Sequence, residues 1–306
     1  MNVPIRLHSL LACFLLSVLA PILVEAAPPA SDETLARARE LLQQKKYREA
    51  AREFTRAEKL LGGRCGDCLL GLSRARVGLG DQKGGAEAAR RAIPLLETPE
   101  AQAEAWNQLG VALSGDKSGN LPEAEAAFRK ALELGGENLV RVNLAEVLFR
   151  AERHAEALDL AREALQANVW GPDSPGARIV LCQAKRVVSP PFLNPDEPVE
   201  GQACRVDTEL ADEAGPAAKG TVTRPEKIFG WLPSFPNGGK FGEIFLEAVI
   251  DEEGCVRNIR VCRGLTPAMD RVTQETLSRW VFQPASVEGM PVAVHYTLSV
   301  KVAASR

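Results

Sequence analysis

The stretch FGEIFLEAVIDEEGCVRNIRV, residues 241–261, decides the fold of the C-terminal part of the chain. Apolar and polar residues alternate on both sides of Glu253-Gly254. A period of two is typical of strands, and two such runs around a short polar turn predict a β-hairpin. The alternating apolar residues are Ile244, Leu246, Ala248 and Ile250 before the turn, and Val256, Ile259 and Val261 after it.

The residues that follow change period twice. The run LTPAMDRVTQETLSRWVFQPA, residues 265–285, has a period near 3.6, which predicts a helix. Its apolar positions are Met269, Val272, Thr276, Leu277 and Trp280. The run VEGMPVAVHYTLSVKV, residues 287–302, alternates again and predicts a last strand over Val292–Val302. Together these runs predict a ββαβ unit, one antiparallel sheet with a helix on one face.

The preceding half of the chain repeats itself. Tyr47-x-x-Ala50-x-x-x-Phe54-x-x-Ala57 recurs as Leu121-x-x-Ala124-x-x-x-Phe128-x-x-Ala131 and as His154-x-x-Ala157-x-x-x-Ala161-x-x-Ala164, with a degenerate copy ending at Ala92. The spacing resembles that of tetratricopeptide repeats (TPR) and implies four helix pairs. Alanines let the paired helices approach, and larger apolar residues fill the space to the next pair. We expect polar residues of the first helices to face a groove, namely Arg39, Gln43, Arg74, Asn107, Arg141 and Asn143.

These patterns divide the 306 residues into four segments. We predict a leader over 1–26, TPR repeats over 33–168, a proline-rich linker or cap over 169–220, and a second domain over 221–306. The net charge of −3 is mixed along the chain, and aromatic residues make up only 5%. A nucleic-acid partner is therefore not expected.

The N-terminus combines Arg6 with an apolar run over Leu10–Val24 and small residues before Ala27. This order is typical of a secretory signal peptide. The run is shorter than the ~20 residues of a spanning helix, although a short membrane anchor remains the alternative. We expect a periplasmic or other cell-envelope location, with membrane contact only through this segment if it is retained.

Six cysteines follow the predicted leader, which suits an oxidising compartment. Cys255 and Cys262 lie on one predicted strand, too far apart to pair with each other. Cys65 and Cys68 are spaced so that they can pair or form a redox couple, and Cys182 and Cys204 flank one loop-rich segment that a bond between them can close. Structural stapling is the favoured interpretation, because the βαβ pattern around a thioredoxin-like site is missing.

Sequence motifs for catalysis were not found. There is no GxSxG, HExxH, phosphate loop or dinucleotide fingerprint. The three histidines have no ligand spacing to the cysteine pair, so neither a metal nor a cofactor is expected. The acidic residues Asp251-Glu252-Glu253 are predicted to form a solvated turn. A thiol oxidoreductase using Cys65 and Cys68 is the remaining enzymatic alternative.

The order and spacing of glycine, proline and aromatic residues in the C-terminal segment resemble those of the C-terminal domain of the TonB family. The matching motifs are Pro233-x-Phe235-Pro236, Gly242, Ile250-Asp251-x-x-Gly254-x-Val256, Trp280-x-Phe282-x-Pro284-Ala285 and Gly289-x-Pro291-Val292. The resemblance covers roughly a quarter of the chain and rests on the order of these motifs. It implies a binding module that docks on periplasmic parts of outer-membrane transporters.

The resemblance also implies how docking occurs. A partner peptide adds as a strand to the sheet edge, here the strand with Val292, Val294, Tyr296 and Leu298. The approach to this edge is the segment with Leu232, Pro233, Phe235 and Pro236. Leu232 replaces the glutamine usual in the family, and neither the family's Ser–His membrane helix nor its long proline-rich spacer is present.

The sequence therefore predicts an α+β multidomain protein, an all-α TPR solenoid followed by a small ββαβ TonB-like domain. We expect a non-enzymatic envelope adaptor with protein partners on both parts. The alternative is a membrane-anchored TonB-type energy transducer that couples the inner-membrane proton motive force to transport through ExbB/ExbD-like proteins.

Overall fold

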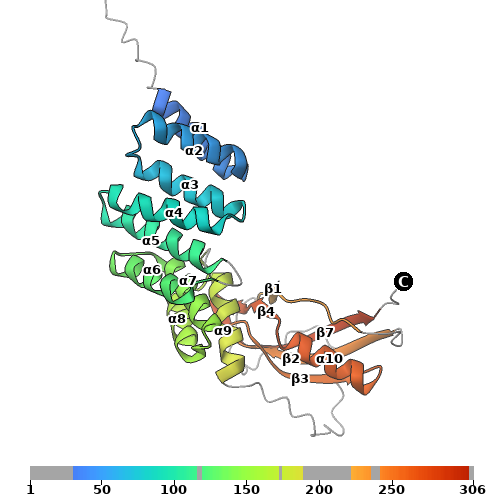
Figure 1. Ribbon diagram of the computed structural model, residues 1–306. Helices are drawn as coiled ribbons and strands as arrows, with labels where there is room; N and C mark the ends of the chain where they lie inside the picture. Colours follow the sequence, from blue (N-terminus) through green and yellow to red (C-terminus); the bar gives the residue numbers. More distant parts are fainter. Residues whose placement is uncertain (1–29, 116–118, 172–173, 189–221, 236–241, 303–306) are drawn as a thin grey trace, which may run out of the picture.

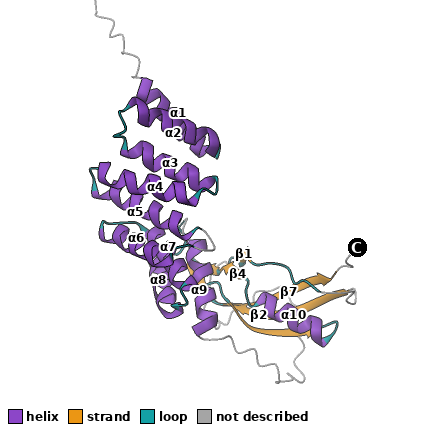
Figure 2. Ribbon diagram, viewed as in Figure 1, coloured by secondary structure: helices purple, strands orange, loops and turns teal. Residues whose placement is uncertain are grey.

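A computed structural model of the chain describes residues 30–115, 119–171, 174–188, 222–235 and 242–302 (Figure 1). A stack of helices forms the N-terminal part, and a smaller β-rich domain with one helix lies beside its last member (Figure 2). The predicted fold class is confirmed. The predicted leader over residues 1–26 lies outside the described residues.

Four helix pairs make up the array. They are α1 (Ala30–Gln43) with α2 (Tyr47–Leu60), α3 (Gly66–Gly78) with α4 (Gln82–Ala92), α5 (Pro99–Ser114) with α6 (Leu121–Glu133), and α7 (Asn138–Arg150) with α8 (His154–Ala167). A short 3-10 turn, Ile93–Leu95, follows α4. The first helices α1, α3, α5 and α7 contact one another along the array, which places them on its inner side.

Small residues set the spacing between adjacent helices, both between pairs and within a pair. Gly71 of α3 lies against Phe54 of α2, and a Cβ on Gly71 would stand 2.3 Å from the Phe54 ring. Gly110 of α5 stands in the same relation to Phe128 of α6, at 2.6 Å. The alanines of the repeat are fully enclosed, including Ala50, Ala57, Ala124, Ala131 and Ala164 at 0% exposure. The repeat pattern is thus a packing pattern, as its spacing predicted.

A ninth helix closes the array. It is α9 (Ser174–Val188), within the segment predicted as linker or cap. Ala177, Leu181 and Ala184 of α9 are buried in the cluster built by α7 and α8. Because the last repeat would otherwise expose an apolar face, α9 acts as its cap.

The main sheet of the C-terminal domain has the strand order β3-β2-β7. Its antiparallel strands are β2 (Gly242–Ile250), β3 (Val256–Arg263) and β7 (Val294–Val302). The helix α10 (Pro267–Leu277) covers one face, and inward side chains such as Ile244, Leu246 and Leu298 form the core with it. This is the predicted ββαβ unit.

Two small antiparallel sheets extend that unit. One pairs β1 (Glu226–Phe229) with β4 (Val281–Gln283), and the other pairs β5 (Ala285–Val287) with β6 (Met290–Val292). The β5–β6 turn has positive φ at Glu288 (50°) and Gly289 (81°), which suits a two-residue hairpin. This hairpin pairs Val292 with Ala285, so the prediction of one strand over Val292–Val302 was wrong at its start.

The sequence also misplaced part of the helix. Thr266 caps α10 by accepting from the Met269 N–H, and Pro267 begins the helix. The buried stripe is Met269, Thr273 and Leu277, whereas Val272 and Thr276 are half-buried. Trp280 lies beyond the helix end but is still buried, at 6% exposure.

Candidate functional site

The predicted groove residues lie on the first helices, and most of them bond to the next pair. Arg39 of α1 pairs with Asp67 of α3 at 2.9 Å. Arg74 of α3 pairs with Glu104 of α5. The Asn143 amide of α7 donates to Asn107 Oδ1 of α5 at 2.9 Å. These contacts form a polar ladder along the inner side of the array, so the side chains fix the spacing of the helices. Gln43 is exposed on α1, and Arg141 is half-buried on α7.

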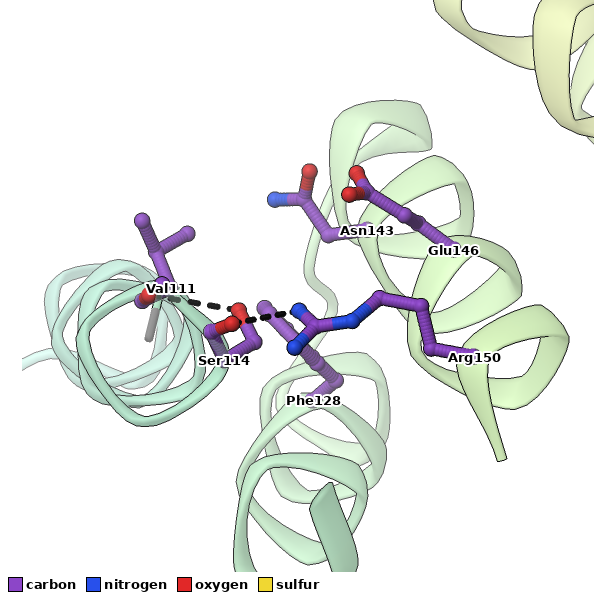
Figure 3. Close-up of a pocket in the computed structure, with 7 residues that line it drawn as sticks. Val111, Ser114, Phe128, Asn143, Glu146 and Arg150 are labelled. Atoms are coloured by element: carbon purple, nitrogen blue, oxygen red, sulfur yellow. Dashed lines mark hydrogen bonds between the residues drawn. The ribbon is translucent and has the colours of Figure 1, made fainter. Parts of the chain in front are cut away.

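A pocket lies between α5, α6 and α7, beside Asn143 of this ladder (Figure 3). It has a volume of about 490 Å³ and is lined by Val111, Ser114, Gly115, Phe128, Asn143, Glu146 and Arg150. Arg150 of α7 donates to the Ser114 carbonyl oxygen of α5 and closes one side. Asn143 lies on the same helix, so the pocket includes one predicted groove residue. Its lining combines apolar, amide and charged groups, which suits a peptide side chain better than a cofactor.

The predicted docking segment presents apolar side chains on a fixed backbone. Leu232 is 72% exposed, and its neighbour Trp231 is 80% exposed. The buried Trp280 donates its indole N–H to the Trp231 carbonyl oxygen at 2.7 Å. Gly230 has φ +139°, and a Cβ there would stand 2.2 Å from Trp280 Cδ1. The core thus holds the backbone while two large side chains face solvent, an arrangement typical of protein contact sites.

The other predicted members of this segment are placed differently. Pro233 is half-buried, and Phe235 packs against the domain core. Pro236 lies outside the described residues. Trp231 was not among the predicted docking residues. An exposed aromatic residue cannot be distinguished from a core residue by its type alone, which is why the sequence did not identify it.

The predicted edge residues are divided between two strands. Val294, Tyr296 and Leu298 lie on β7, which stands at one end of the order β3-β2-β7, whereas Val292 lies on β6. Val294 and Leu298 point into the core, and Tyr296 packs edge-on against Phe282 with ring centroids 5.9 Å apart. Strand addition at β7 therefore stays a prediction, and it would rely on backbone groups more than on these side chains.

The disulfides agree only in part with the predicted pairs. Cys65 bonds to Cys68 at the start of α3, and both are buried, at 8% and 0% exposure. Such burial favours a structural staple over a redox couple. Cys182 bonds to Cys255, so the predicted pair of Cys182 with Cys204 was wrong. Cys204 lies outside the described residues, and Cys262 is also disulfide-bonded.

The Cys182–Cys255 pair was missed because it joins two domains. The residues are 73 positions apart, yet their Cα atoms are 5.4 Å apart in the fold. Cys182 lies on α9, and Cys255 lies at the β2–β3 turn. No local pattern reports such a contact, since it depends on how the C-terminal domain rests on the cap of the array.

The acidic turn is not solvated as predicted. Asp251 is 6% exposed and accepts from Lys185 Nζ of α9 at 3.0 Å. Glu253 pairs with the same lysine and with Arg162 of α8, at 3.2 Å to the latter. Burial raises the pKa of Glu253. The hydrogen bonds and charges of Lys185 and Arg162 lower it by a larger amount, so the pKa of Glu253 is below its usual value.

These acidic groups are accounted for without a metal. Asp251, Glu253 and Cys255 bring ligand-type atoms within 4.8 Å of one another. The Cys255 sulfur is held in the disulfide, and the Lys185 ammonium already lies against both carboxylates. The cluster is therefore an ion-pair network between α9 and the turn.

Comparison with known proteins gives two matches, one for each part of the chain. Residues 237–301 match the family described as Gram-negative bacterial TonB protein C-terminal. Residues 35–98 and 112–171 match the tetratricopeptide repeat family. Both resemblances seen in the sequence are confirmed. No curated protein matches the chain.

Solved structures that resemble the chain include TPR proteins. PilW, a type IV pilus biogenesis factor, is 22% identical, with a TM-score of 0.46 over 54% of this chain and 72% of that one. MamA is 16% identical, with a TM-score of 0.43 over 52% and 83%. The Sgt2 TPR domain from Aspergillus fumigatus is 22% identical, with a TM-score of 0.37 over 40% and 80%.

The matched families define the general class of the protein. TPR and TonB C-terminal domains are non-catalytic protein-interaction domains, and the latter occur in Gram-negative envelope proteins. Among the described residues, no helix is both long and apolar enough to cross a membrane. The two family matches indicate a protein-interaction module in the envelope.

Proposed function

We propose that the chain is a periplasmic adaptor whose TonB-like domain docks on the periplasmic part of an outer-membrane transport protein. The TPR array holds a second protein along its inner side. Neither part is an enzyme. The observation that carries the proposal is the pair Trp231 and Leu232, which stands in solvent on a backbone fixed by Trp280.

The docking segment has the physical properties of a binding hot spot. Its two exposed side chains lie next to each other, and tryptophan is enriched among residues that dominate binding energy. Because Gly230 and the Trp280 hydrogen bond already order the backbone, little conformational entropy is lost on binding. The half-buried Pro233 limits the backbone further. A partner would therefore bind a preformed surface.

The end strand β7 supplies a second element of the proposed contact. In the binding mode implied by the TonB family, a segment of the partner lies along β7, and the docking segment contacts the side chains of that partner segment. The buried Val294 and Leu298 keep β7 in place from the core side. In recognition of this kind the main-chain hydrogen bonds give the affinity, so binding does not require the glutamine that Leu232 replaces.

Site-specific photo-crosslinking tests the proposal. A photoreactive amino acid is placed at position 232 in the full chain, produced in its native cell envelope and irradiated. We expect a cross-link to an outer-membrane transport protein, identified by mass spectrometry. The matched control carries the same group at Leu79, which is 47% exposed on the array. A transporter that cross-links equally from both positions, or from neither, contradicts the docking surface.

The location of the protein is tested separately. The mature N-terminus is sequenced from envelope fractions, with alkaline extraction alongside. We expect a chain that begins at Ala27 and is released by alkali. An intact N-terminus that resists extraction would instead support the anchored energy transducer, whose partners would be ExbB/ExbD-like proteins.

A further inference from the structure

Within the residues that the structure describes, the Cys182–Cys255 disulfide joins the array to the C-terminal domain at their contact. Cys182 of α9 and Cys255 at the β2–β3 turn form the disulfide. Figure 1 shows α9 as the helix of the array that lies beside the β-rich domain. We name this contact the joint; it comprises α9, Arg162 and Trp170 on the array side, and residues 251–255 with Gly289 on the other.

Each side of the joint has its own hydrophobic core. The core of α7, α8 and α9 is one cluster, and the core of β2, β3, β7 and α10 is another. Within the described residues, Cys255 is the only member of the C-terminal domain that is buried in the array's cluster. Each part therefore keeps its core whether or not the joint is closed.

Most other contacts in the joint are polar. Arg178 of α9 is 1% exposed and donates to the Glu253 carbonyl oxygen at 2.8 Å. Lys185 bonds to both Asp251 and Glu253, and Trp170 donates its indole N–H to the Gly289 carbonyl oxygen at 2.8 Å. The desolvation of buried charges offsets most of their attraction. Partly exposed ion pairs add little. Polar contacts of this kind give orientation but only modest affinity.

We propose that the Cys182–Cys255 disulfide is a redox-sensitive latch. While it is closed, the two protein-binding parts form one unit. When a dithiol reductant opens it, the C-terminal domain separates from α9, and both parts stay folded. The claim goes beyond the proposed function, because it concerns how the two parts are held and not what they bind.

The exchange reaction is balanced. One thiolate of the dithiol attacks Cys182 Sγ, since Cys182 is half-buried whereas Cys255 is 6% exposed. The S–S bond breaks, and Cys255 leaves as a thiolate that takes up a proton. The second thiol of the reductant then attacks its own sulfur in the mixed disulfide and releases Cys182. Two electrons pass to the protein disulfide, and the reductant becomes a cyclic disulfide.

The test compares the full chain with Cys182→Ser/Cys255→Ser under oxidising conditions, so that the other disulfides stay intact. Nitrogen-15 relaxation gives the rotational correlation time of each part, and small-angle X-ray scattering gives the radius of gyration. We expect one shared correlation time in the wild type. In the variant we expect a clearly shorter time for the C-terminal domain and a larger radius of gyration.

Two controls separate the latch from other contacts. Cys65→Ser/Cys68→Ser removes the disulfide within the array and should leave one shared correlation time. Lys185→Met removes the ion pairs of Lys185 with Asp251 and Glu253 but keeps the disulfide, and it should also leave the joint closed. A single shared time in Cys182→Ser/Cys255→Ser, or an open joint in Lys185→Met, overturns the proposal.

A misfolded double variant does not end the test. In that case the wild type is treated with graded dithiothreitol, and alkylation with peptide mapping identifies the fraction in which Cys182–Cys255 is reduced. Separate tumbling that grows with this fraction supports the latch. Shared tumbling in fully reduced joints contradicts it.

Discussion

The array is built from contacts between segments that are close in sequence, whereas the C-terminal domain depends on contacts between segments that are far apart in sequence. In the array each helix packs on its neighbours in sequence, and Phe54 meets Gly71 within the same stretch of chain. In the C-terminal domain, β2 pairs with β7 from Gly242↔Val302 to Ile250↔Val294, across the whole domain. Local contacts leave a repeated pattern in the sequence, whereas distant pairings leave only the alternation of each strand. The difference explains which predictions succeeded.

The two parts also differ in how they tolerate a local change. An array of repeats divides its stability among neighbouring interfaces, so a defect stays near its site. A small domain with one core loses most of its stability at once when that core is disturbed. A core substitution should therefore destabilise only neighbouring helices in the array, whereas a matched substitution should destabilise the whole C-terminal domain.

A large loss of stability, comparable to that of a core truncation, is expected at Gly254 in the β2–β3 turn. A Cβ there would stand 1.9 Å from the Phe282 carbonyl oxygen, and φ is +89°. Overpacking against backbone together with a left-handed residue should cost about 2–5 kcal/mol for Gly254→Ala. The free energy of unfolding of the C-terminal domain, from denaturant titration, measures it.

Gly289→Ala is the matched control for that substitution. Gly289 has φ +81° but nothing within 4 Å of an added Cβ, so only backbone strain of about 1 kcal/mol is expected. Equal costs at the two glycines would mean that the contact of Gly254 with Phe282 does not constrain the turn.

Trp280→Ala should cost about 3–5 kcal/mol, because it removes a large side chain that is 6% exposed in the core of the C-terminal domain. The loss of the hydrogen bond to Trp231 also frees the docking segment. Trp231→Ala serves as the control: that side chain is 80% exposed, and its removal should change stability by no more than about 0.5 kcal/mol. A large cost at Trp231 would show that it is part of the core and not of a binding surface.

Gly71→Ala tests the array side of the comparison. The added methyl group meets the Phe54 ring, and overpacking should cost about 1–3 kcal/mol, less about 1 kcal/mol for the better helix propensity of alanine. Phe54→Leu in the same chain should recover part of the loss. Hydrogen exchange should report weaker protection in α2 and α3 alone. Lower protection throughout the C-terminal domain would contradict the separation of the cores.

The smallest expected effect concerns acid. The folded pKa of Glu253 is below its usual value, so its contribution to the joint is fully present above the unfolded pKa of about 4.3. The contribution is lost as the pH falls through the folded pKa, which protonates the carboxylate facing Lys185 and Arg162. The effect should be below about 1 kcal/mol, since the ion pairs are partly exposed. Glu253→Gln should reduce the dependence of the free energy of unfolding on pH below pH 5. An unchanged dependence would mean that Glu253 does not stabilise the joint.

The sequence was sufficient to predict the main helices and strands, but it was insufficient to predict the contacts between them. The repeat and the alternating runs predicted the array, the hairpin and the last strand. They did not predict that Glu288-Gly289 would turn the chain and draw Val292 into a separate strand, because a three-residue strand has no measurable period. Nor did they place Asp251 and Cys255 against α9, since burial by another domain leaves no local pattern.

For the candidate site, residue types were predicted better than their contacts. Leu232 was placed on the docking segment, but the neighbouring Trp231 is the more exposed side chain. Arg39, Arg74, Asn107 and Asn143 lie on the first helices as expected. The sequence did not indicate that each would bond to a residue on a neighbouring first helix. Helical spacing gives the side of a helix and not the partner across the gap.

Disulfide mapping tests the central claim, two separately packed parts joined at one covalent contact. The protein is digested without reduction, with free thiols blocked, and the linked peptides are identified by mass spectrometry. We expect one linked pair that contains Cys182 and Cys255, another that contains Cys65 and Cys68, and no blocked free thiol at Cys262. A link between Cys182 and Cys204, or a blocked free thiol at Cys182, would contradict the joint and the orientation of the two parts that depends on it.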